Sequence, residues 1–354
     1  MSKLTDWVVR PNTDNQSVVF YDREKGTFTQ LKPKQLADTA LAGSEAAAVQ
    51  APLKVYFDMT YRCNLECRHC ITRSSPFVDI TPELSTDRIL QIVEELATLG
   101  VLEIAVGGGE PMVHPDWDVI FKHITDLKMN LIVTTNGLLL NERNLQILKS
   151  VKPLETRVSF DGGKAFHNSI RGRDTYTKAL RGLHNLHKKG LNATARFTYC
   201  NGADTEMETL FSDIADTGIS TIKIAVLKKA GRAINEKDLI PQMPDRDTAL
   251  WFNSLGKKYK LQVQLSSDDF PINYLETNDP KLRDLTRSNC GAGFETCYIS
   301  PYGQVLSCVT MPHLSFGALH EDTFMSVWQS HKAESYRAKA SACGVCRICD
   351  GLNK

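Results

Sequence analysis

The chain has 354 residues, of which 42% are hydrophobic and 23% charged, and its 42 basic and 41 acidic residues leave a formal charge of +1. This composition is that of a globular protein long enough for about two domains, and no apolar run approaches the ~20 residues of a membrane span. Without an excess of basic residues, neither nucleic acid nor an anionic membrane surface is an expected partner.

The first 50 residues predict a small appendage. Their start lacks the apolar core of a signal peptide, so we expect a cytoplasmic protein whose thiols are reduced. Short β-like runs at 7–10, 17–21 and 27–29 precede an alanine-rich stretch, 37–51. We interpret residues 1–50 as a small β appendage followed by a linker or a short helix.

Residues 51–235 alternate between strand and helix patterns, and the apolar residues between 87 and 99 share one helical face. The predicted strands are 53–59, 102–107, 131–135, 155–160, 192–199 and 221–227. Six successive β/α units predict an α/β fold with a parallel sheet. Functional groups are then expected at the carboxyl ends of the strands.

Alternation within the strands predicts a polar interior. In the strand at 192–199, Thr194, Arg196 and Thr198 alternate with apolar residues, and Cys200 continues the polar set. One set faces the helices, so the polar set points into the barrel. Closed eight-stranded barrels are instead filled by branched apolar side chains. We therefore expect this barrel to hold a ligand.

The remainder of the chain divides into two parts. Residues 236–289 predict a connecting region with a helix at 246–259 and a strand at 261–265. Residues 290–354 carry a hairpin pattern over 297–308, a helix near 323–338, and six cysteines. In a reducing compartment so many cysteines favour metal or redox chemistry over disulfides.

Cys63, Cys67 and Cys70 follow the first barrel strand directly. Three thiolates within eight residues can reach three corners of one 4Fe-4S cube, which leaves the fourth iron open to another ligand. A zinc site that takes His69 as its fourth ligand is the alternative, as is a chance cluster, although zinc ligands more often come as two C-x2-C pairs.

This C-x3-C-x2-C spacing resembles the signature of the radical SAM superfamily, whose open iron binds S-adenosylmethionine (SAM). Further matching motifs stand at successive strand ends: Gly107-Gly108-Gly109-Glu110-Pro111, Thr135-Asn136-Gly137, Ser159-Phe160-Asp161-Gly162 and the following His167–Gly172. The resemblance spans residues 53–230 and implies a partial (β/α)6 radical SAM barrel. It implies these SAM-binding residues: His69, Gly108, Gly109, Glu110, Asn136, Ser159, Asp161 and Arg171.

The C-terminal cysteines resemble the SPASM or twitch extension of some radical SAM enzymes, as in peptide maturases of the mycofactocin type. Cys290-Gly291-Ala292-Gly293 and the Pro301-Tyr302-Gly303 turn carry this likeness. It implies at least one auxiliary 4Fe-4S cluster with Cys290, Cys308, Cys343 and Cys346 as ligands. Cys297 and Cys349 are rival ligands, or partial ligands of a second cluster. A structural zinc ribbon is the alternative.

Cys200 lies outside both cysteine groups, at the end of a predicted strand. A free cysteine there is either a hydrogen-atom donor to a substrate radical or a small buried hydrophobe. The resemblance implies that a 5′-deoxyadenosyl radical made from SAM abstracts a hydrogen atom. Oxidation then follows if the auxiliary cluster accepts an electron, and epimerisation follows if a thiol returns a hydrogen atom.

Three functions follow from these features. The first is modification of a ribosomally synthesised peptide, by a crosslink or an epimerisation. The second is dehydrogenation, decarboxylation or epimerisation of a small molecule such as a sugar or aminocyclitol. The third is a non-enzymatic iron-sulfur or zinc protein. By resemblance, a flavodoxin or ferredoxin supplies the electron.

Overall fold

A computed structural model describes residues 7–12, 17–31, 51–266 and 291–343. The strands are β1 (Trp7–Asn12), β2 (Ser17–Asp22), β3 (Thr27–Leu31), β4 (Lys54–Thr60), β5 (Glu103–Gly108), β6 (Asn130–Thr135), β7 (Glu155–Phe160), β8 (Ala193–Tyr199), β9 (Thr221–Val226), β10 (Gln262–Leu265), β11 (Thr296–Ile299), β12 (Gln304–Leu306) and β13 (Ser315–Ala318). The α-helices are α2 (Thr86–Thr98), α3 (Trp117–Asp126), α4 (Glu142–Val151), α5 (Lys164–Arg171), α6 (Thr175–Lys188), α7 (Met207–Asp216), α8 (Arg246–Tyr259), α10 (Phe324–Trp328) and α11 (His331–Cys343).

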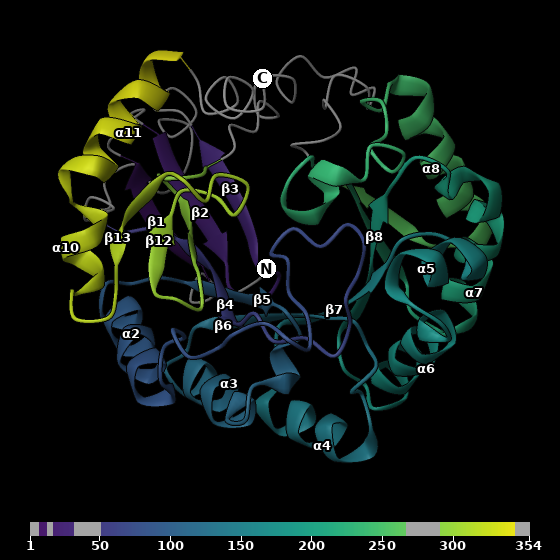
Figure 1. Ribbon diagram of the computed structural model, residues 1–354, viewed down its shortest axis with the longest axis horizontal. Helices are drawn as coiled ribbons and strands as arrows, with labels where there is room; N and C mark the ends of the chain where they lie inside the picture. The colour runs from purple at the N-terminus through teal and green to yellow at the C-terminus, as the bar shows by residue number, and fades with distance from the viewer. Residues whose placement is uncertain (1–6, 13–16, 32–50, 267–290, 344–354) are drawn as a thin grey trace.

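The six predicted barrel strands are β4 to β9, and each pairs in parallel with the next. Their helices lie on the outer side of the curved sheet, as Figure 1 shows. The sheet is longer than six strands, because β10 pairs in parallel with β9 at one edge and β11, β12 and β13 extend the other. The predicted α/β fold with a partial barrel is confirmed.

Amphipathic helices hold the barrel together, and α2 is typical of them. The Ser85 side chain caps its start by accepting a hydrogen bond from Arg88 N. Its buried face, Ile89, Ile92, Val93 and Leu96, joins the single large core formed by the strands and helices. Full burial of each such side chain contributes about 1.5–3 kcal/mol, so the sheet is firmly fixed beneath the strand ends.

The C-terminal hairpin continues the barrel sheet. Strand β11 runs parallel to β4, with Tyr298 opposite Tyr56, and β12 returns antiparallel to β11. The single helix expected near 323–338 is wrong, since two helices, α10 and α11, occupy this stretch. Ser330 separates them, because its hydroxyl accepts a hydrogen bond from Ala333 N and so begins α11 as a cap.

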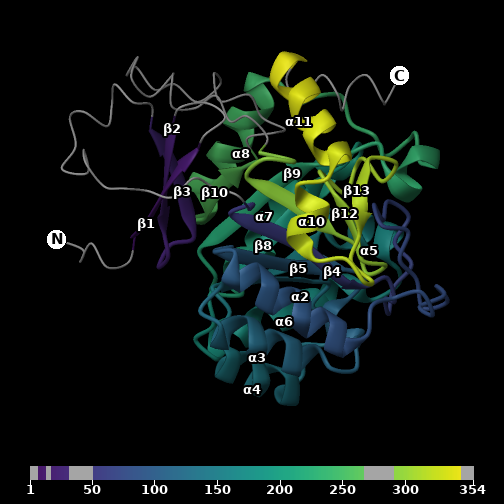
Figure 2. The same cartoon turned by 90° about the vertical axis from the view of Figure 1, so that its left-hand side faces the viewer.

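The N-terminal strands form a separate antiparallel sheet beside the barrel (Figure 2). The β2–β3 turn attaches it to the amino ends of the barrel strands. Tyr21 Oη donates to Glu103 Oε2 at 3.2 Å and accepts from Asn130 Nδ2 at 2.7 Å, while Arg23 donates to the carbonyl of Lys128. The alanine-rich linker up to residue 50 lies outside the described residues.

No helix of the described ranges is long and apolar enough to cross a membrane. The amphipathic helices of the barrel instead bury one face against the sheet, as α2 does.

Candidate functional site

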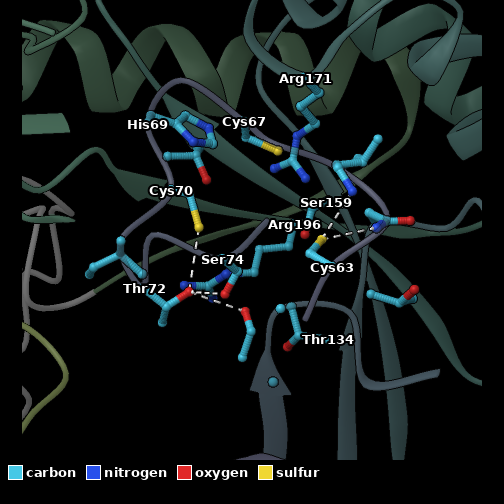
Figure 3. Close-up of a pocket in the computed structure, with 18 of the residues that line it drawn as sticks. Cys63, Cys67, His69, Cys70, Thr72, Ser74, Thr134, Ser159, Arg171 and Arg196 are labelled. Atoms are coloured by element: carbon cyan, nitrogen blue, oxygen red, sulfur yellow. Dashed lines mark hydrogen bonds between the residues drawn. The ribbon is translucent and has the colours of Figure 1, made fainter. Parts of the chain in front are cut away.

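A cavity of about 280 Å³ opens at the carboxyl ends of the barrel strands. Cys63, Cys67 and Cys70 all line it, and Figure 3 shows their sulfur atoms around one space. The loop that carries them leaves β4 at Thr60 and crosses the mouth of the barrel. The structure thus brings together the three cysteines that the sequence predicts to act as one group.

These thiols fit an iron-sulfur cluster. Burial raises the pKa of Cys63 to about 12 and that of Cys67 to about 11, so thiolates here need a nearby cation such as iron. Among the described residues, no three His, Cys, Asp or Glu side chains are grouped closely enough to hold one metal ion. In a 4Fe-4S cube each of the three thiolates binds a different iron, so its thiol ligands lie farther apart than the ligands of a single metal ion.

Glu110 lies behind the cavity wall and fixes the third strand end. Its carboxylate is fully buried and accepts hydrogen bonds from Thr135 Oγ1 at 2.9 Å and from Asn136 N at 2.8 Å. Burial raises the pKa of Glu110 to about 7 despite these bonds. Asn136 in turn donates to Asn64 Oδ1 at 2.7 Å. Glu110 therefore positions Asn136, which lines the cavity, and holds it beside the cysteine loop.

Asp161 joins the cysteine loop to α5. It is fully buried and binds His69 Nε2 through Oδ1 at 2.8 Å and Arg171 Nε through Oδ2 at 2.5 Å. Burial alone would raise the pKa of Asp161, but the Arg171 and His69 charges outweigh burial and hold it far below its usual range. His69 and Arg171 line the cavity, whereas Asp161 lies behind them.

Six of the eight residues that the resemblance assigns to SAM binding line this cavity, namely His69, Gly108, Gly109, Asn136, Ser159 and Arg171. Glu110 and Asp161 are the two that do not. Glu110 instead holds the lining residue Asn136 by a hydrogen bond, and Asp161 holds the lining residues His69 and Arg171. Close packing requires the glycines, because a Cβ at Gly109 would collide with the backbone of Arg62.

Arg232 was not singled out by the sequence, yet it clamps the cysteine loop. Its backbone N–H donates to the Cys70 carbonyl at 2.9 Å. Its guanidinium donates to the Cys67 and Ser74 carbonyls, both at 2.8 Å. Gly231 has φ +58°, and a Cβ there would collide with the carbonyls of Cys70 and Ile71. These contacts bridge some 165 residues of sequence, so no local pattern signals them.

Gly231→Ala is expected to disturb the cysteine loop, and Gly190→Ala is its matched control. Both glycines have positive φ, but a Cβ at Gly190 meets nothing within 4 Å. The control therefore bears only the left-handed backbone strain, roughly 1–2 kcal/mol. Gly231→Ala must also displace the loop, and we expect a ~10- to 100-fold loss of cluster affinity or SAM cleavage. Iron content and 5′-deoxyadenosine formation measure this. Equal iron in the two variants would contradict the clamp.

The interior face of β8 is polar, as its alternation predicts. Arg196 and Thr198 line the cavity, whereas Ala195 and Phe197 are fully buried in the core. Thr134 on β6, two strands away in the sheet, also lines it. Figure 3 shows Arg196 reaching toward the cysteine loop. The barrel therefore keeps polar groups on its inner face instead of filling itself with apolar side chains.

Cys200 lies outside this cavity. It is fully buried in a small cluster with Ile170, Leu227, Ala233 and Leu239, and its thiol donates to the Thr198 carbonyl at 3.5 Å. Burial raises its pKa well above the usual range. This environment is the one expected of a packing cysteine. A hydrogen donor at Cys200 stays a prediction.

The C-terminal cysteines are described only in part. Cys290, Cys346 and Cys349 lie outside the described residues, and Cys343 ends α11. Cys297, on β11, is fully buried in the core. Its side chain lies on the opposite face of the sheet from that of its neighbour Tyr298. Cys308 is half-buried and lines a second cavity between the hairpin and the barrel. Of the two, Cys308 has the more accessible sulfur.

Comparison with known families agrees with this geometry. A model of the radical SAM superfamily matches residues 57–213, and a model of SPASM, an iron-sulfur cluster-binding domain, matches residues 290–350. Together the two matches span more than half of the chain.

Curated relatives and a solved structure extend the comparison. The chain is 26% identical over 307 residues to the mycofactocin maturase MftC of Mycobacterium tuberculosis (strain CDC 1551 / Oshkosh), covering 85% of this chain and 76% of that protein. It is 25% identical over 324 residues to the AdoMet-dependent heme synthase of Methanosarcina barkeri, covering 86% and 92%. SuiB of Streptococcus suis, crystallised with its precursor peptide SuiA, matches the fold with a TM-score of 0.71 at 13% identity, covering 97% and 93%.

Proposed function

Because the chain belongs to the radical SAM superfamily and carries a SPASM domain, we propose that it modifies a ribosomally synthesised peptide by a crosslink or an epimerisation. Two comparisons support a peptide substrate. MftC is a maturase that covers most of this chain, and SuiB, which shares the fold, was crystallised with a precursor peptide. We also propose four parts of the chain: a small N-terminal β appendage with a linker (1–50), the radical SAM barrel (51–235), a connecting region (236–289) and the C-terminal SPASM/twitch domain (290–354).

When bound, the reduced 4Fe-4S cluster and SAM supply a 5′-deoxyadenosyl radical that takes a hydrogen atom from the substrate. Cys63, Cys67 and Cys70 would hold that cluster. His69, Gly108, Gly109, Asn136, Ser159 and Arg171 would contact SAM directly, since they line the cavity beside the thiols. Glu110 and Asp161 would orient these groups through the hydrogen bonds described above.

A space for the substrate is the observation that carries the proposal. A second cavity, of about 680 Å³, lies between the barrel and the hairpin. It shares six lining residues with the first, namely Ile71, Thr72, Gly107, Gly108, Thr134 and Arg196. It reaches Cys308. A side chain of a peptide placed there would lie between the radical source and an auxiliary cluster, which suits an oxidative outcome.

The auxiliary cluster belongs to the SPASM segment. We propose Cys290, Cys308, Cys343 and Cys346 as its ligands, with Cys297 and Cys349 as rivals. The burial of Cys297 in the apolar core supports Cys308 over Cys297. A flavodoxin or ferredoxin is the proposed electron source.

A tetrapyrrole is a second candidate substrate. The AdoMet-dependent heme synthase of Methanosarcina barkeri is as similar in sequence as MftC, and the chain covers 92% of it. Arg196 lines the larger cavity and would suit a substrate carboxylate. This candidate replaces a peptide with a small molecule but keeps the same radical source.

Transfer of deuterium into 5′-deoxyadenosine distinguishes these substrates. The probes are a short peptide encoded beside the gene, deuterated at its non-exchangeable positions, and a deuterated iron porphyrin. The anaerobically reconstituted, reduced protein is incubated with SAM and one probe. We expect deuterium from the peptide only. Transfer from the porphyrin alone, or 5′-deoxyadenosine that carries no peptide deuterium, would contradict the peptide proposal.

A further inference from the structure

Two carboxylates, Asp58 and Glu295, line the larger cavity, and Asp58 is the one that lies against the glycines shared with the first cavity. Asp58 lies on β4, where Val55, Phe57 and Met59 enter the core, while Lys54, Tyr56 and Asp58 face the cavity. The Asp58 side chain is buried, with only 6% of the residue exposed. A charged group so enclosed needs a structural or a chemical reason.

The glycines at the end of β5 place no side chain between Asp58 and the SAM cavity, the name used here for the first cavity, of about 280 Å³. Gly107 and Gly108 line both cavities. A Cβ at Gly107 would stand 3.2 Å from Asp58 Oδ1, and one at Gly108 would stand 3.0 Å from Asp58 Cβ. Since glycine adds no side chain there, nothing from β5 separates the carboxylate from the space that the two cavities share.

A chain of hydroxyl groups connects Asp58 to the C-terminal hairpin. Tyr298 Oη donates to Asp58 Oδ2 at 2.5 Å, and the hydroxyls of Tyr298 and Tyr61 lie 3.0 Å apart. Tyr298 belongs to β11, 240 residues away in sequence, and lines the same cavity. The Asp58 carboxyl group is therefore part of a hydrogen-bonded chain with the Tyr298 and Tyr61 hydroxyls, along which a proton can be shared.

Within the part of the chain that the structure describes, no cation forms an ion pair with Asp58. Burial raises the pKa of Asp58 to about 7, and the hydrogen bond from Tyr298 opposes this only in part. Two cations of the cavity wall are engaged elsewhere: Lys54 binds Glu103 at 2.5 Å, and Arg157 binds Glu155 at 2.6 Å. Arg196 is the third cation of the wall. A carboxyl group of this kind exchanges protons near neutral pH.

We propose that Asp58 is the catalytic proton acceptor of the oxidation, with Tyr298 as the residue that positions its carboxylate. The role rests on the proposed function in its oxidative form. A substrate C–H bond breaks by hydrogen-atom transfer, and a neighbouring X–H group then gives its proton to Asp58. A new C–X bond or a C=X double bond forms, and the one remaining electron passes to the auxiliary 4Fe-4S cluster.

The test compares Asp58→Asn and Tyr298→Phe with Tyr302→Phe as the matched control. Tyr302 is on the same hairpin, but its hydroxyl donates to the Asp79 carbonyl at 3.3 Å at an exposed position, outside the cavity lining. With the deuterated peptide, Asp58→Asn should still transfer deuterium to 5′-deoxyadenosine while oxidised product falls by ~100-fold or more. Tyr298→Phe should lose less product, and the control should match wild type.

A second readout needs no substrate or cluster. Infrared spectroscopy of the wild-type protein should show a protonated carboxyl band that disappears as pH rises through about 7. Burial also raises the pKa of Glu110 to about 7, so the Asp58 band is identified as the one that is lost in the difference spectrum between wild type and Asp58→Asn. This Asp58 band should shift in Tyr298→Phe. Wild-type product yield in Asp58→Asn, or a carboxyl spectrum that Asp58→Asn leaves unchanged, would overturn the role of Asp58. Wild-type protein that yields no oxidised peptide would instead overturn the oxidative function, and the difference band reports on Asp58 regardless.

Discussion

Replacing Cys63, Cys67 or Cys70 by alanine is expected to remove one iron-sulfur cluster and to stop SAM cleavage. Each supplies one of the three thiols that line the cavity, and SAM would take the fourth position of the cluster that they hold. The loss should exceed the ~10- to 100-fold that removal of an outer-shell partner costs a metal site. Iron and sulfide analysis after anaerobic reconstitution, with a 5′-deoxyadenosine assay, measures both effects.

Cys200→Ala is the matched control for this experiment. It also removes a buried thiol, but one that packs among apolar side chains and does not line the cavity. Its iron content should equal that of the wild type, whereas each of the three loop variants should lose one cluster and keep the SPASM cluster. A loop variant that retains full iron and SAM cleavage would remove that cysteine from the ligand set.

Asp161→Asn is expected to destabilise the fold strongly. The variant leaves the Arg171 guanidinium, which is almost wholly buried, without its counter-ion. Breaking a buried ion pair by removal of one partner costs roughly 3–5 kcal/mol. Urea unfolding of wild type and variant in the same cluster-loading state measures this at pH 7. Asp126→Asn, which breaks only the exposed pair with Lys122, should change stability little.

The same pair predicts a pH dependence with a defined sign. The folded-state pKa of Asp161 is held below its unfolded value of about 4. Its stabilisation is therefore present above pH ~4 and is lost as pH falls below that value toward the folded-state pKa. The difference in the free energy of unfolding between wild type and Asp161→Asn should therefore become smaller as the pH falls below about 4. A difference that is constant from pH 7 to pH 3 would contradict the pairing.

Local pattern predicts the barrel well. The strands expected at 155–160 and 192–199 are β7 and β8 almost to the residue, and the helix at 246–259 is α8. These elements follow from apolar periodicity, which the core enforces. The split between α10 and α11 was missed because the Ser330 cap that begins α11 acts through a hydrogen bond and leaves no mark in the apolar pattern.

The site divides in the same way. The cysteine loop and the glycine turn are each a contiguous segment of the sequence. The cysteine spacing therefore predicts an iron-sulfur site, and the family resemblance assigns the glycine turn to SAM binding. Arg232 and the Asp58–Tyr298 pair are brought to the site by tertiary structure alone, across 165 and 240 residues. The burial of Glu110 and Asp161 behind the wall also depends on packing, because a motif identifies a residue without saying which way its side chain points.

Electron-nuclear double resonance on the reduced, anaerobically reconstituted protein tests the central claim most directly. SAM would carry ¹⁵N in its amino group and ¹⁷O in its carboxylate. Because only a cluster in contact with SAM senses these nuclei, the auxiliary cluster would not interfere. Coupling from both labels, lost in Cys63→Ala, is the predicted result. A cluster spectrum that SAM leaves unchanged, or zinc as the only metal at Cys63, Cys67 and Cys70, would contradict it.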